Sequence, residues 1–585
     1  MLILGLSSPY KNDASVALMR DGKLEAAIEN YKIQPAAFNN IPEAAVEYCL
    51  AKGGITWGDI DVVAIANDPF RGWMRRAFSH RRLSLLAPVA TIYQQGKELN
   101  RLAKEWTGIR ILRRRLRNEQ KLVSLNHHSC HAASAFFLSA FDKALICTLD
   151  GEGDGLCGLL AVGDGCQIRV QNTISYSNSI GWLYSRMTDL IGFRHSRDEH
   201  KTQWQGLQGE PIYKDVFLRI LRRPGEVFPR LDLHYFRRDL TGGFVPSRFL
   251  FDQLGLSCER SELTAEQKRD IAKSVQVAIT EVVSDLLVSF QRKFGIAKIC
   301  LGGGVFQNVL LVSSLEQKFG MGNIFVPPAP GNAGCAVGAA AWIWHQQMSK
   351  PRQPEIRSVY LGPSFVRQEI KDALDNVKAS YSLHNGDESM LATAVQLLRA
   401  GKIIGWFQGA AEFGPRALGH RSILASPWAP FVTENINDYV KHRESFRPFA
   451  VSVCEEDCDK YFEASSLCRF MNSLGIVRSD RDILPQALQL MGGLIRLHLV
   501  EKQTNRLLWE LLKRFGEYEE APILVNTSFN LYDEPSVVRP RDAIRTFFCS
   551  GTEAVFIDRF LLTKWSAAYI LNGRSVPRPK LQERT

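Results

Sequence analysis

The amino-acid sequence predicts an α/β protein in which a two-lobed N-terminal domain is followed by a second α/β domain. Three observations predict this class: a three-strand unit that occurs twice, a long amphipathic helix followed by glycine-rich strand ends, and a polar, proline-containing stretch after which the α/β pattern resumes. The chain has 585 residues, of which 45% are hydrophobic and 23% charged, and this suits two or three globular domains. We expect residues 1–350 to form the first domain, 351–380 a linker region and 381–585 the second domain.

The three-strand unit is the first of these features. Its first copy, at 2–24, reads LILGLSS, PYKND and ASVALM, with an Asp-Gly turn into a third strand. The second copy, at 144–168, reads ALICTLD, GEGDG and LCGLLAV, with a GDG turn into another strand. Strands bounded by Asp and Gly clusters form hairpins, and a repeated unit indicates two related lobes. The arrangement resembles the actin-like ATPases, which hold a nucleotide's phosphates between two such hairpins; chance recurrence of common hairpin chemistry is the alternative.

A long helix and two glycine-rich turns come next. Thr264 and Gln267 form a capping box, apolar residues recur at helical spacing as far as Phe290, and Gly295 ends the run. The strand AKICLGGG and the stretch PGNAG at 330–334 follow. Both turns lie at strand ends, where open α/β folds bind ligands, so they predict a nucleotide site.

Proline marks the boundary between the domains. Pro351, Pro354 and Pro363 stand in a polar run, which is the composition of a linker. A second α/β pattern begins near Tyr381 and continues almost to the end of the chain. This change of composition is the reason why we predict a linker region at 351–380.

Charge, cysteine content and hydropathy exclude several classes. The formal net charge is +11 and basic residues gather between Arg71 and Lys121, but no RRM, KH or zinc-finger signature accompanies them. A solvated basic face, or attraction of a phosphorylated substrate, is favoured over specific nucleic-acid recognition. The 12 cysteines include no CxxC pair, which indicates reduced thiols. No run reaches the ~18 apolar residues of a membrane helix and no signal peptide is recognisable, so we expect a cytoplasmic protein without a membrane partner.

Two histidines and an aspartate predict a metal site. His127 and His131 are one turn apart on an expected helix, a spacing that lets two imidazoles bind one ion. Asp150, in the second hairpin, brings a carboxylate to the phosphate side of the expected nucleotide cleft. The alternative is that the histidines cap the helix or are simply buried.

A second group of residues predicts an oxyanion pocket. The segments 412–422 and 441–449 combine Arg and Lys with glycine turns and phenylalanines, and NTSFN at 526–530 adds hydroxyl and amide donors. Guanidinium groups bind phosphate through two hydrogen bonds. A surface salt-bridge network is the alternative, but the apolar neighbours favour a pocket.

These motifs identify a family. HHSCHAASAF, EFGPRALGHRSILASP, KHRESFRPFA and NTSFN followed by Glu534-Pro535 resemble the ATP-dependent O-carbamoyltransferases, which include the nodulation-factor, cephem and tobramycin enzymes. The resemblance implies an actin-like N-terminal domain and a YrdC-like C-terminal domain. It implies that carbamoyl phosphate and ATP give a carbamoyl-adenylate, and that the carbamoyl group passes to a hydroxyl, or an amine, of a small natural product. It also implies a divalent metal, iron(II) first and magnesium(II) as a companion.

The resemblance assigns roles residue by residue. The carbamoyl phosphate positions are Arg416, Lys441, Arg447, Arg496 and Ser528. The metal positions are His127, His131, Asp150 and Asn332. The cofactor-binding positions are Gly302, Gly303, Gly304, Asn308, Lys201 and Gly331, and Asp13 is a catalytic residue of the first hairpin.

The sequence also departs from the family pattern in the first domain. Asn12 stands where the family has histidine, and Asn332 stands where the fourth metal ligand is usually aspartate. The expected Thr-His-Val-Asp-Gly segment is replaced at 489–493, and the usual Lys-Val-Met-Gly-Leu stretch reads KTQWQGL at 201–207. Two alternatives therefore stay open beside carbamoyl transfer: an acyl-adenylate enzyme with a different second step, and a non-catalytic nucleotide-binding partner. Asn332 has its own alternative, a cap for a helix expected at 336–344.

Overall fold

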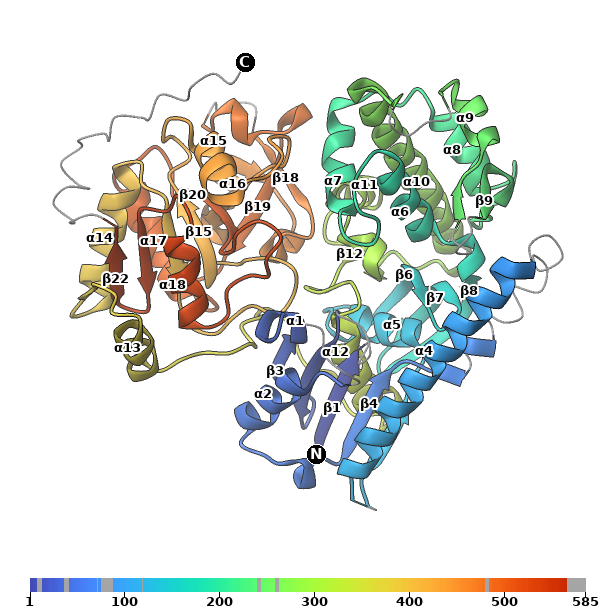
Figure 1. Cartoon of the computed structure of the whole chain (residues 1–585), viewed down its shortest axis with the longest axis horizontal. Helices are drawn as coiled ribbons and strands as arrows, with labels where there is room; N and C mark the ends of the chain where they lie inside the picture. Colours follow the sequence, from blue (N-terminus) through green and yellow to red (C-terminus); the bar gives the residue numbers. More distant parts are fainter. Residues whose placement is uncertain are drawn as a thin grey trace.

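The fold is described from a computed structural model in which two α/β bodies lie side by side (Figure 1). The first lobe is blue, the second lobe is mainly teal and green, and the C-terminal domain is yellow, orange and red. The structure describes residues 1–7, 13–35, 41–70, 72–74, 88–117, 119–238, 244–257, 262–478 and 483–564. Among these residues no helix is both long enough and apolar enough to cross a membrane.

The first lobe is built on a five-stranded sheet of order β3-β2-β1-β4-β5. The hairpin strands β2 and β3 are antiparallel to their neighbours, whereas β4 and β5 run parallel to β1. The strands are β1 (Leu2–Ser7), β2 (Ser15–Arg20), β3 (Lys23–Glu29), β4 (Val62–Ala66) and β5 (Lys121–Ser124).

The second lobe repeats this sheet. Its order is β12-β11-β6-β7-β8, again with an antiparallel three-strand hairpin followed by two parallel strands. The strands are β6 (Lys143–Gly153), β7 (Leu156–Asp164), β8 (Gln167–Ser175), β11 (Ile299–Gly302) and β12 (Ile324–Phe325). The predicted duplication into two lobes is confirmed, and chance recurrence of hairpins does not explain a match of all five strands.

Helices cover both sheets and connect them. The predicted long helix is α10 (Ala265–Phe294): Thr264 and Gln267 form the capping box, and Gly295 ends the helix at φ +65°. The short helix α12 (Gly334–Ala341) packs against α5 of the second lobe and against β1 and β2 of the first, so it joins the lobes. The other helices of this part are α1 (Asn30–Ile33), α2 (Glu43–Gly53), α4 (Pro88–Arg115), α5 (His127–Phe137), α6 (Ile180–Leu190), α7 (Glu199–Gln205), α8 (Lys214–Leu221), α9 (Arg248–Leu254) and α11 (Val309–Phe319), with a strand pair β9 (Phe236–Arg238) and β10 (Phe244–Pro246).

The C-terminal domain is a second α/β unit, as predicted. Its ten-stranded mixed sheet has the order β13-β22-β21-β14-β15-β20-β16-β19-β18-β17. The strands are β13 (Ser382–Leu383), β14 (Ile404–Phe407), β15 (Arg421–Ala425), β16 (Ala450–Cys454), β17 (Phe462–Glu463), β18 (Leu474–Val477), β19 (Leu494–Val500), β20 (Ile523–Ser528), β21 (Ala554–Ile557) and β22 (Phe560–Thr563). The helices are α13 (Arg367–Asn376), α14 (Asp387–Arg399), α15 (Val432–Ile436), α16 (Cys458–Tyr461), α17 (Arg506–Gly516) and α18 (Pro540–Phe548).

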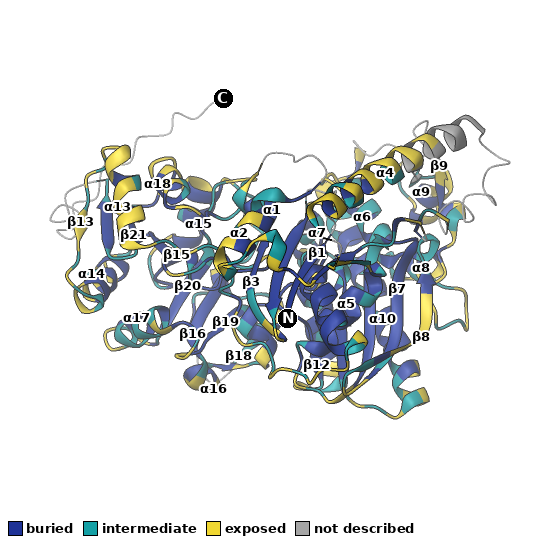
Figure 2. Cartoon of the chain, turned by 90° about the horizontal axis from the view of Figure 1, so that it is seen from below, coloured by how far each residue is buried: buried dark blue, intermediate teal, exposed yellow. Residues whose placement is uncertain are grey.

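The segment between the domains contacts both of them. Residues 351–366 form no helix or strand, and α13, inside the region expected as a linker, packs against α18 of the C-terminal domain. Leu361 accepts a hydrogen bond from the Ala27 amide of β3, and Gly362 donates one to the carbonyl of Ala411. The segment therefore lies between the first lobe and a loop of the C-terminal domain. Figure 2 shows most strands of both domains as buried, although the edge strands β8 and β13 are exposed, as is much of α4.

Candidate functional site

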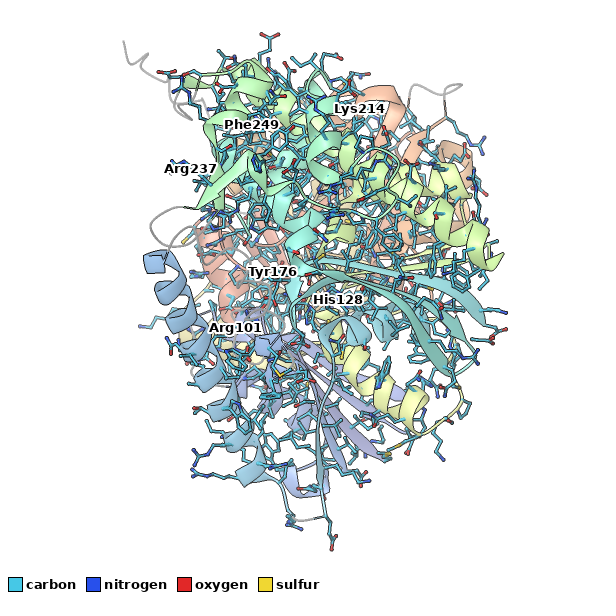
Figure 3. The ribbon with its side chains drawn as sticks, turned by 90° about the vertical axis from the view of Figure 1, so that its right-hand side faces the viewer. Arg101, His128, Tyr176, Lys214, Arg237 and Phe249 are labelled. Atoms are coloured by element: carbon cyan, nitrogen blue, oxygen red, sulfur yellow. The ribbon has the colours of Figure 1, made fainter. Side chains whose placement is uncertain are left out.

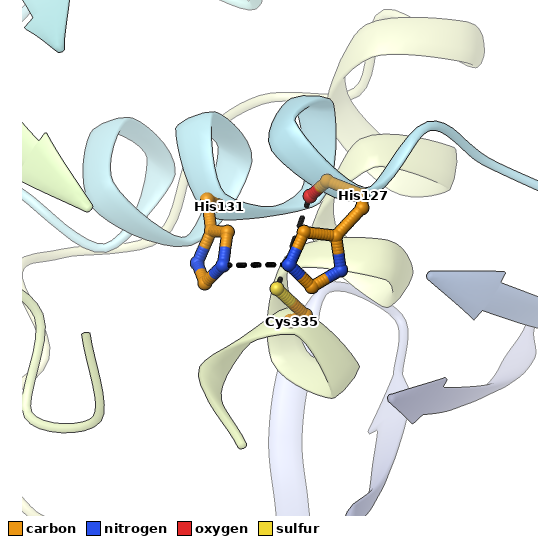
Figure 4. Close-up of side chains that lie close together, drawn as sticks. All are labelled: His127, His131 and Cys335. Atoms are coloured by element: carbon orange, nitrogen blue, oxygen red, sulfur yellow. Dashed lines mark hydrogen bonds between the residues drawn. The ribbon is translucent and has the colours of Figure 1, made fainter. Parts of the chain in front are cut away.

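The histidine pair lies at the beginning of α5. Asn126 is the N-cap of this helix and accepts a hydrogen bond from the Ser129 amide, which fixes the first turn. The Nε2 atoms of His127 and His131 lie 3.0 Å apart, and each lies 3.2 Å from Oδ2 of Asp150 on β6. The structure thus brings three of the predicted metal residues to one point, where the two rings meet edge to face (Figure 4).

The charges at this point suit a cation. Burial alone would raise the pKa of Asp150, but hydrogen bonds from His127 and His131 hold that pKa well below its usual value. Burial lowers the pKa of His131, so its imidazole is neutral near pH 7. A carboxylate and two imidazole nitrogens that converge on one point are a typical donor set for a divalent metal.

The neighbouring side chains hold this arrangement in place. Asp154 accepts hydrogen bonds from the backbone amides of His127 and Asp68, at 2.8 and 3.0 Å. His128 lies 3.0 Å from the Thr148 hydroxyl through Nδ1, and burial lowers its pKa to about 3. His128 therefore serves packing, and Figure 3 shows it at the strands of the second lobe, with Arg101 at α4 beyond the hairpin.

Asn332 lies between this site and the first hairpin. Its side-chain amide donates a hydrogen bond to the carboxylate of Asp13, and its carbonyl oxygen Oδ1 is buried without a hydrogen-bond partner among the described residues. The alternative role as a helix cap is not seen, because α12 begins at Gly334 with Ala333 as N-cap and no capping side chain. The helix expected at 336–344 in fact covers 334–341 and continues as a π-helical turn, because its alanine-rich start already follows the glycine turn. Asn12 lies outside the described residues.

Cys335 was not predicted as part of the site. Its Sγ and the ring nitrogens of His127 and His131 all lie within 4.8 Å of one another (Figure 4). Burial raises the pKa of this thiol well above its usual value, so it is protonated in the ligand-free protein. The signal that could have found Cys335 is its place three residues after Asn332, directly after the glycine turn.

The glycine-rich turn lies against the same carboxylate. A Cβ on Gly304 would come within 2.9 Å of Oδ1 of Asp150, and a Cβ on Gly331 within 2.2 Å of the Gln307 amide nitrogen. Gly303, at φ +99°, donates its amide to the Pro330 carbonyl, and Gly302 lies against the backbone of α5. Two glycine turns from different strand ends are therefore packed closely beside the histidine pair.

Asn308 and Lys201 lie apart from these glycines in their contacts. Asn308 is the N-cap of α11 and donates its side-chain amide to Gln276 at 2.7 Å. Lys201, on α7, reaches the C-terminal domain: its Nζ lies 2.7 Å from Oε1 of Glu444. The sequence grouped Lys201 with the nucleotide turn, whereas its contacts place it beside the predicted oxyanion pocket.

The predicted oxyanion residues come from five places in the C-terminal domain. Arg416 lies on the loop between β14 and β15, Lys441 ends the helical segment Asn437–Lys441, Arg447 precedes β16, Arg496 lies on β19 and Ser528 ends β20. Lys441 is buried, and its Nζ donates hydrogen bonds to the carbonyl and hydroxyl oxygens of Ser528. Asn530 Oδ1 accepts a further bond from Lys441 at 2.6 Å.

Burial and, for most of them, neighbouring positive charges lower the pKa values of these cations. Burial, with Arg447 beside it, lowers the pKa of Arg416 to about 10, and burial lowers that of Lys441 well below its usual value, with Arg447 again contributing. Burial, together with Arg416, Arg443 and Arg447, lowers the pKa of Arg496 well below its usual value, and burial also lowers the pKa of Arg447. Nε of Arg416 has no hydrogen-bond partner among the described residues although it is buried. Such a group of cations is stabilised when an anion enters it.

Arg443 belongs to the same group of cations. It stands in the KHRESFRPFA motif, but the motif predicted no role for it. Burial and Arg447 lower its pKa to about 9. Its place two residues after Lys441 in a basic motif is the signal that could have found it. We call Arg416, Lys441, Arg443, Arg447 and Arg496 the cation cage.

The second lobe closes one side of the cation cage. The guanidinium of Arg496 lies 5.5 Å above the ring of Trp204, on α7, and Lys201 of the same helix pairs with Glu444. Glu444 in turn lies 3.9 Å from Arg447 Nη1. Side chains of both domains therefore contact the cation cage.

Comparison with known proteins relates both domains to one family. The family model described as "Carbamoyltransferase N-terminus" matches residues 2–341, and that described as "Carbamoyltransferase C-terminus" matches residues 395–564. An uncharacterized protein of Synechocystis sp. is 32% identical, over 96% of this chain and 96% of the relative. Nodulation protein NolNO of Sinorhizobium fredii is 32% identical over 97% and 81%, and nodulation protein NolO of Bradyrhizobium diazoefficiens 33% identical over 76% and 80%.

Solved structures show only distant likeness. Full-length HypF in its phosphate- and nucleotide-bound form has a TM-score of 0.31 at 15% identity, covering 58% of this chain and 46% of that one. A ROK family glucokinase from Streptomyces griseus has a TM-score of 0.27 at 12% identity, covering 59% and 100%. The sequence relationships, in contrast, extend over nearly the whole chain.

Proposed function

The chain belongs to the carbamoyltransferase family, and from this premise we propose that it makes a carbamoyl-adenylate from carbamoyl phosphate and ATP and transfers the carbamoyl group to a hydroxyl or amine of a small natural product. The observation that carries the proposal is the cation cage. Burial lowers the pKa values of its four arginines and its lysine, and for all of them except Arg447 a neighbouring cation lowers the pKa further; cations gathered at such a cost suit a small anion. Carbamoyl phosphate is such an anion.

The cage supports the first step through charge. Arg416, Arg447 and Arg496 offer paired N–H donors that suit phosphate oxygens, and Lys441 adds a point charge beside the Ser528 hydroxyl. Cations held in this cage stabilise the negative charge that grows on the phosphate as its bond to the carbamoyl carbon breaks. Water adds to the carbamoyl carbon as inorganic phosphate leaves, which gives carbamate. A carbamate oxygen then attacks the α-phosphorus of ATP, and pyrophosphate leaves.

The residues around Asp150 fit the metal that the family implies. Asp150 is anionic and faces the Nε2 atoms of His127 and His131, so these three residues would hold a divalent ion, for which iron(II) is our proposal. A bound divalent cation supplies Lewis acidity toward an acyl or phosphoryl oxygen. The glycine turns at 302–304 and 330–331 are packed beside these ligands, and they are our candidates for binding the nucleotide phosphates through backbone amides.

Asp13 is our candidate for the base of the second step. One of its oxygens accepts the Asn332 amide, whereas Oδ1 is buried without a hydrogen-bond partner among the described residues. An acceptor hydroxyl that reached Oδ1 could deliver its proton there as its oxygen attacks the carbamoyl carbon of carbamoyl-AMP and AMP leaves.

Pyrophosphate release tests the first step. We expect the purified protein with ATP to release pyrophosphate only when carbamoyl phosphate is added, and mass spectrometry of the quenched mixture to show carbamoyl-AMP. Pyrophosphate release that does not depend on carbamoyl phosphate would contradict the proposal.

A further inference from the structure

The loop that carries Arg416 is held by two residues of the first lobe. Nζ of Lys32 donates hydrogen bonds to the backbone carbonyls of Glu412 and Gly414, at 3.0 and 2.6 Å. Oε1 of Glu29 accepts the Gly414 amide at 2.9 Å. The backbone on the N-terminal side of Arg416 is therefore fixed from the other domain.

Glu29 and Lys32 also form an ion pair with each other. Lys32 Nζ lies 2.9 Å from Glu29 Oε2, and the two residues are only 7% and 2% exposed respectively. A buried ion pair usually contributes little more to stability than apolar residues of the same size, because desolvation of both charges is costly. The pair instead positions one loop. The ammonium group of Lys32 and the second carboxylate oxygen of Glu29 both form hydrogen bonds with the backbone of that loop.

The same loop is fixed on the C-terminal side of Arg416. Oε1 of Glu412 accepts the backbone amides of Leu418, His420 and Arg421, at 2.8, 2.9 and 3.1 Å. Arg416 thus stands between two anchored backbone segments, and its guanidinium has its direction set by both.

Packing makes the anchor on the first lobe tight. Phe413 is buried in an apolar cluster with Ala17, Ala27 and Ala336 of the N-terminal domain. Gly414 adopts φ +110°, and a Cβ there would lie 3.1 Å from the Pro328 carbonyl. Only glycine allows this backbone approach without strain.

The anchor lies next to the proposed transfer site. The Asn30 amide, between Glu29 and Lys32 in the chain, donates to the carbonyl of Ala14, the residue after Asp13. The Ser15 hydroxyl donates to the carbonyl of Ala333, the residue after Asn332. One strand end of the first lobe thus contacts the segments that carry Asp13, Asn332 and Arg416.

We propose that Glu29 and Lys32 are positioning residues for Arg416: their ion pair, made entirely within the N-terminal domain, keeps the cation cage of the C-terminal domain in its anion-binding form. This inference rests on the proposed function, in which the cage binds carbamoyl phosphate. Loss of the pair lets the 412–414 backbone move, and the guanidinium of Arg416 moves with it.

The test uses the full-length chain and a double variant, Glu29→Gln with Lys32→Met, which removes both charges and leaves no lone buried ion. The single variant Lys32→Met is measured beside the double variant. The matched control is Lys371→Met, which breaks an exposed ion pair with Asp375 on α13. Titration calorimetry with inorganic phosphate measures the cage, pyrophosphate release gives KM for carbamoyl phosphate and kcat, and metal content reports on the histidine pair.

We expect the double variant to bind phosphate about tenfold more weakly, since two hydrogen bonds from a charged donor are lost. KM should rise by a similar factor with a smaller change in kcat, metal content should match the parent protein, and Lys371→Met should behave like the parent. A folded double variant with the parent's phosphate affinity overturns the inference. Arg447→Ala in the same titration separates the two claims: if it too binds phosphate normally, the cage assignment fails, and if it alone loses phosphate, only the positioning role fails.

Discussion

The histidine site of the second lobe and the cation cage of the C-terminal domain are both recessed groups of polar side chains, but they differ in the charge that would complete them. At the first, the pKa of Asp150 is held below its usual value by hydrogen bonds from two histidines, so the group is anionic. At the second, the pKa values of Arg416 and Arg443 fall to about 10 and about 9 because burial and other cations disfavour their charged forms.

The direction of these shifts separates the roles. A carboxylate among neutral imidazoles suits a metal ion, whereas cations that repel one another suit an oxyanion. The two sites are nevertheless joined, because α7 reaches the cage through Lys201 and Trp204 and the first lobe holds the loop of Arg416. We therefore expect that a substitution at one of the two sites leaves the chemistry of the other intact, although the two sites are joined through contacts between the domains.

Arg447→Ala should have the largest effect and should affect the cage alone. Removing one partner of a largely desolvated anion is expected to cost about 2–5 kcal/mol of carbamoyl phosphate binding. Pyrophosphate release at sub-saturating carbamoyl phosphate measures the loss, and circular dichroism checks the fold. Arg399→Ala, which breaks a surface pair with Glu519, is the matched control. Normal turnover of Arg447→Ala would show that the cage does not bind this substrate.

His131→Ala should remove the metal and leave the cage intact. Loss of a direct ligand should weaken metal binding by more than the ~10–100-fold seen for outer-shell partners. Elemental analysis gives the metal content, and the pyrophosphate assay should be unchanged. If metal content equals that of the parent protein, the histidines serve only packing.

Asn332→Asp should tighten metal binding, by about tenfold, since a carboxylate adds a full charge near the ion. The new carboxylate also faces Asp13 in place of an amide donor, so the metal-free variant should be less stable. Thermal unfolding with and without added iron(II) or manganese(II) should therefore show a larger metal-induced rise in Tm than in the parent. Equal rises would mean that Asn332 lies too far from the ion to matter.

Cys335→Ser should have the smallest effect, within about threefold in metal affinity, because a buried, protonated thiol acts mainly as a small apolar group. Cobalt(II) absorption reports on sulfur directly. We expect no thiolate-to-cobalt charge-transfer band in either protein. A band in the parent that disappears in the variant would make Cys335 a ligand.

Much of the fold follows from local signals in the sequence. The duplicated hairpins and the capping box at Thr264 involve residues close together in the chain, and the structure confirms both. The spacing of His127 and His131 likewise predicted a shared face, since helical geometry alone determines it.

Contacts between distant segments were harder to foresee. The family resemblance assigns Lys201 to cofactor binding, but the structure pairs it with Glu444, more than two hundred residues later in the chain. The Lys32 contact with the loop of Arg416 and the approach of Cys335 to the histidines also depend on tertiary packing. No local pattern of one segment specifies such contacts.

The most direct test of the account compares Arg447→Ala and His131→Ala in one pyrophosphate-release assay with ATP and carbamoyl phosphate. The account predicts that Arg447→Ala loses release whereas His131→Ala keeps the parent rate, because adenylation belongs to the cage and only transfer needs the histidine site. Loss of release in His131→Ala with full release in Arg447→Ala would contradict it.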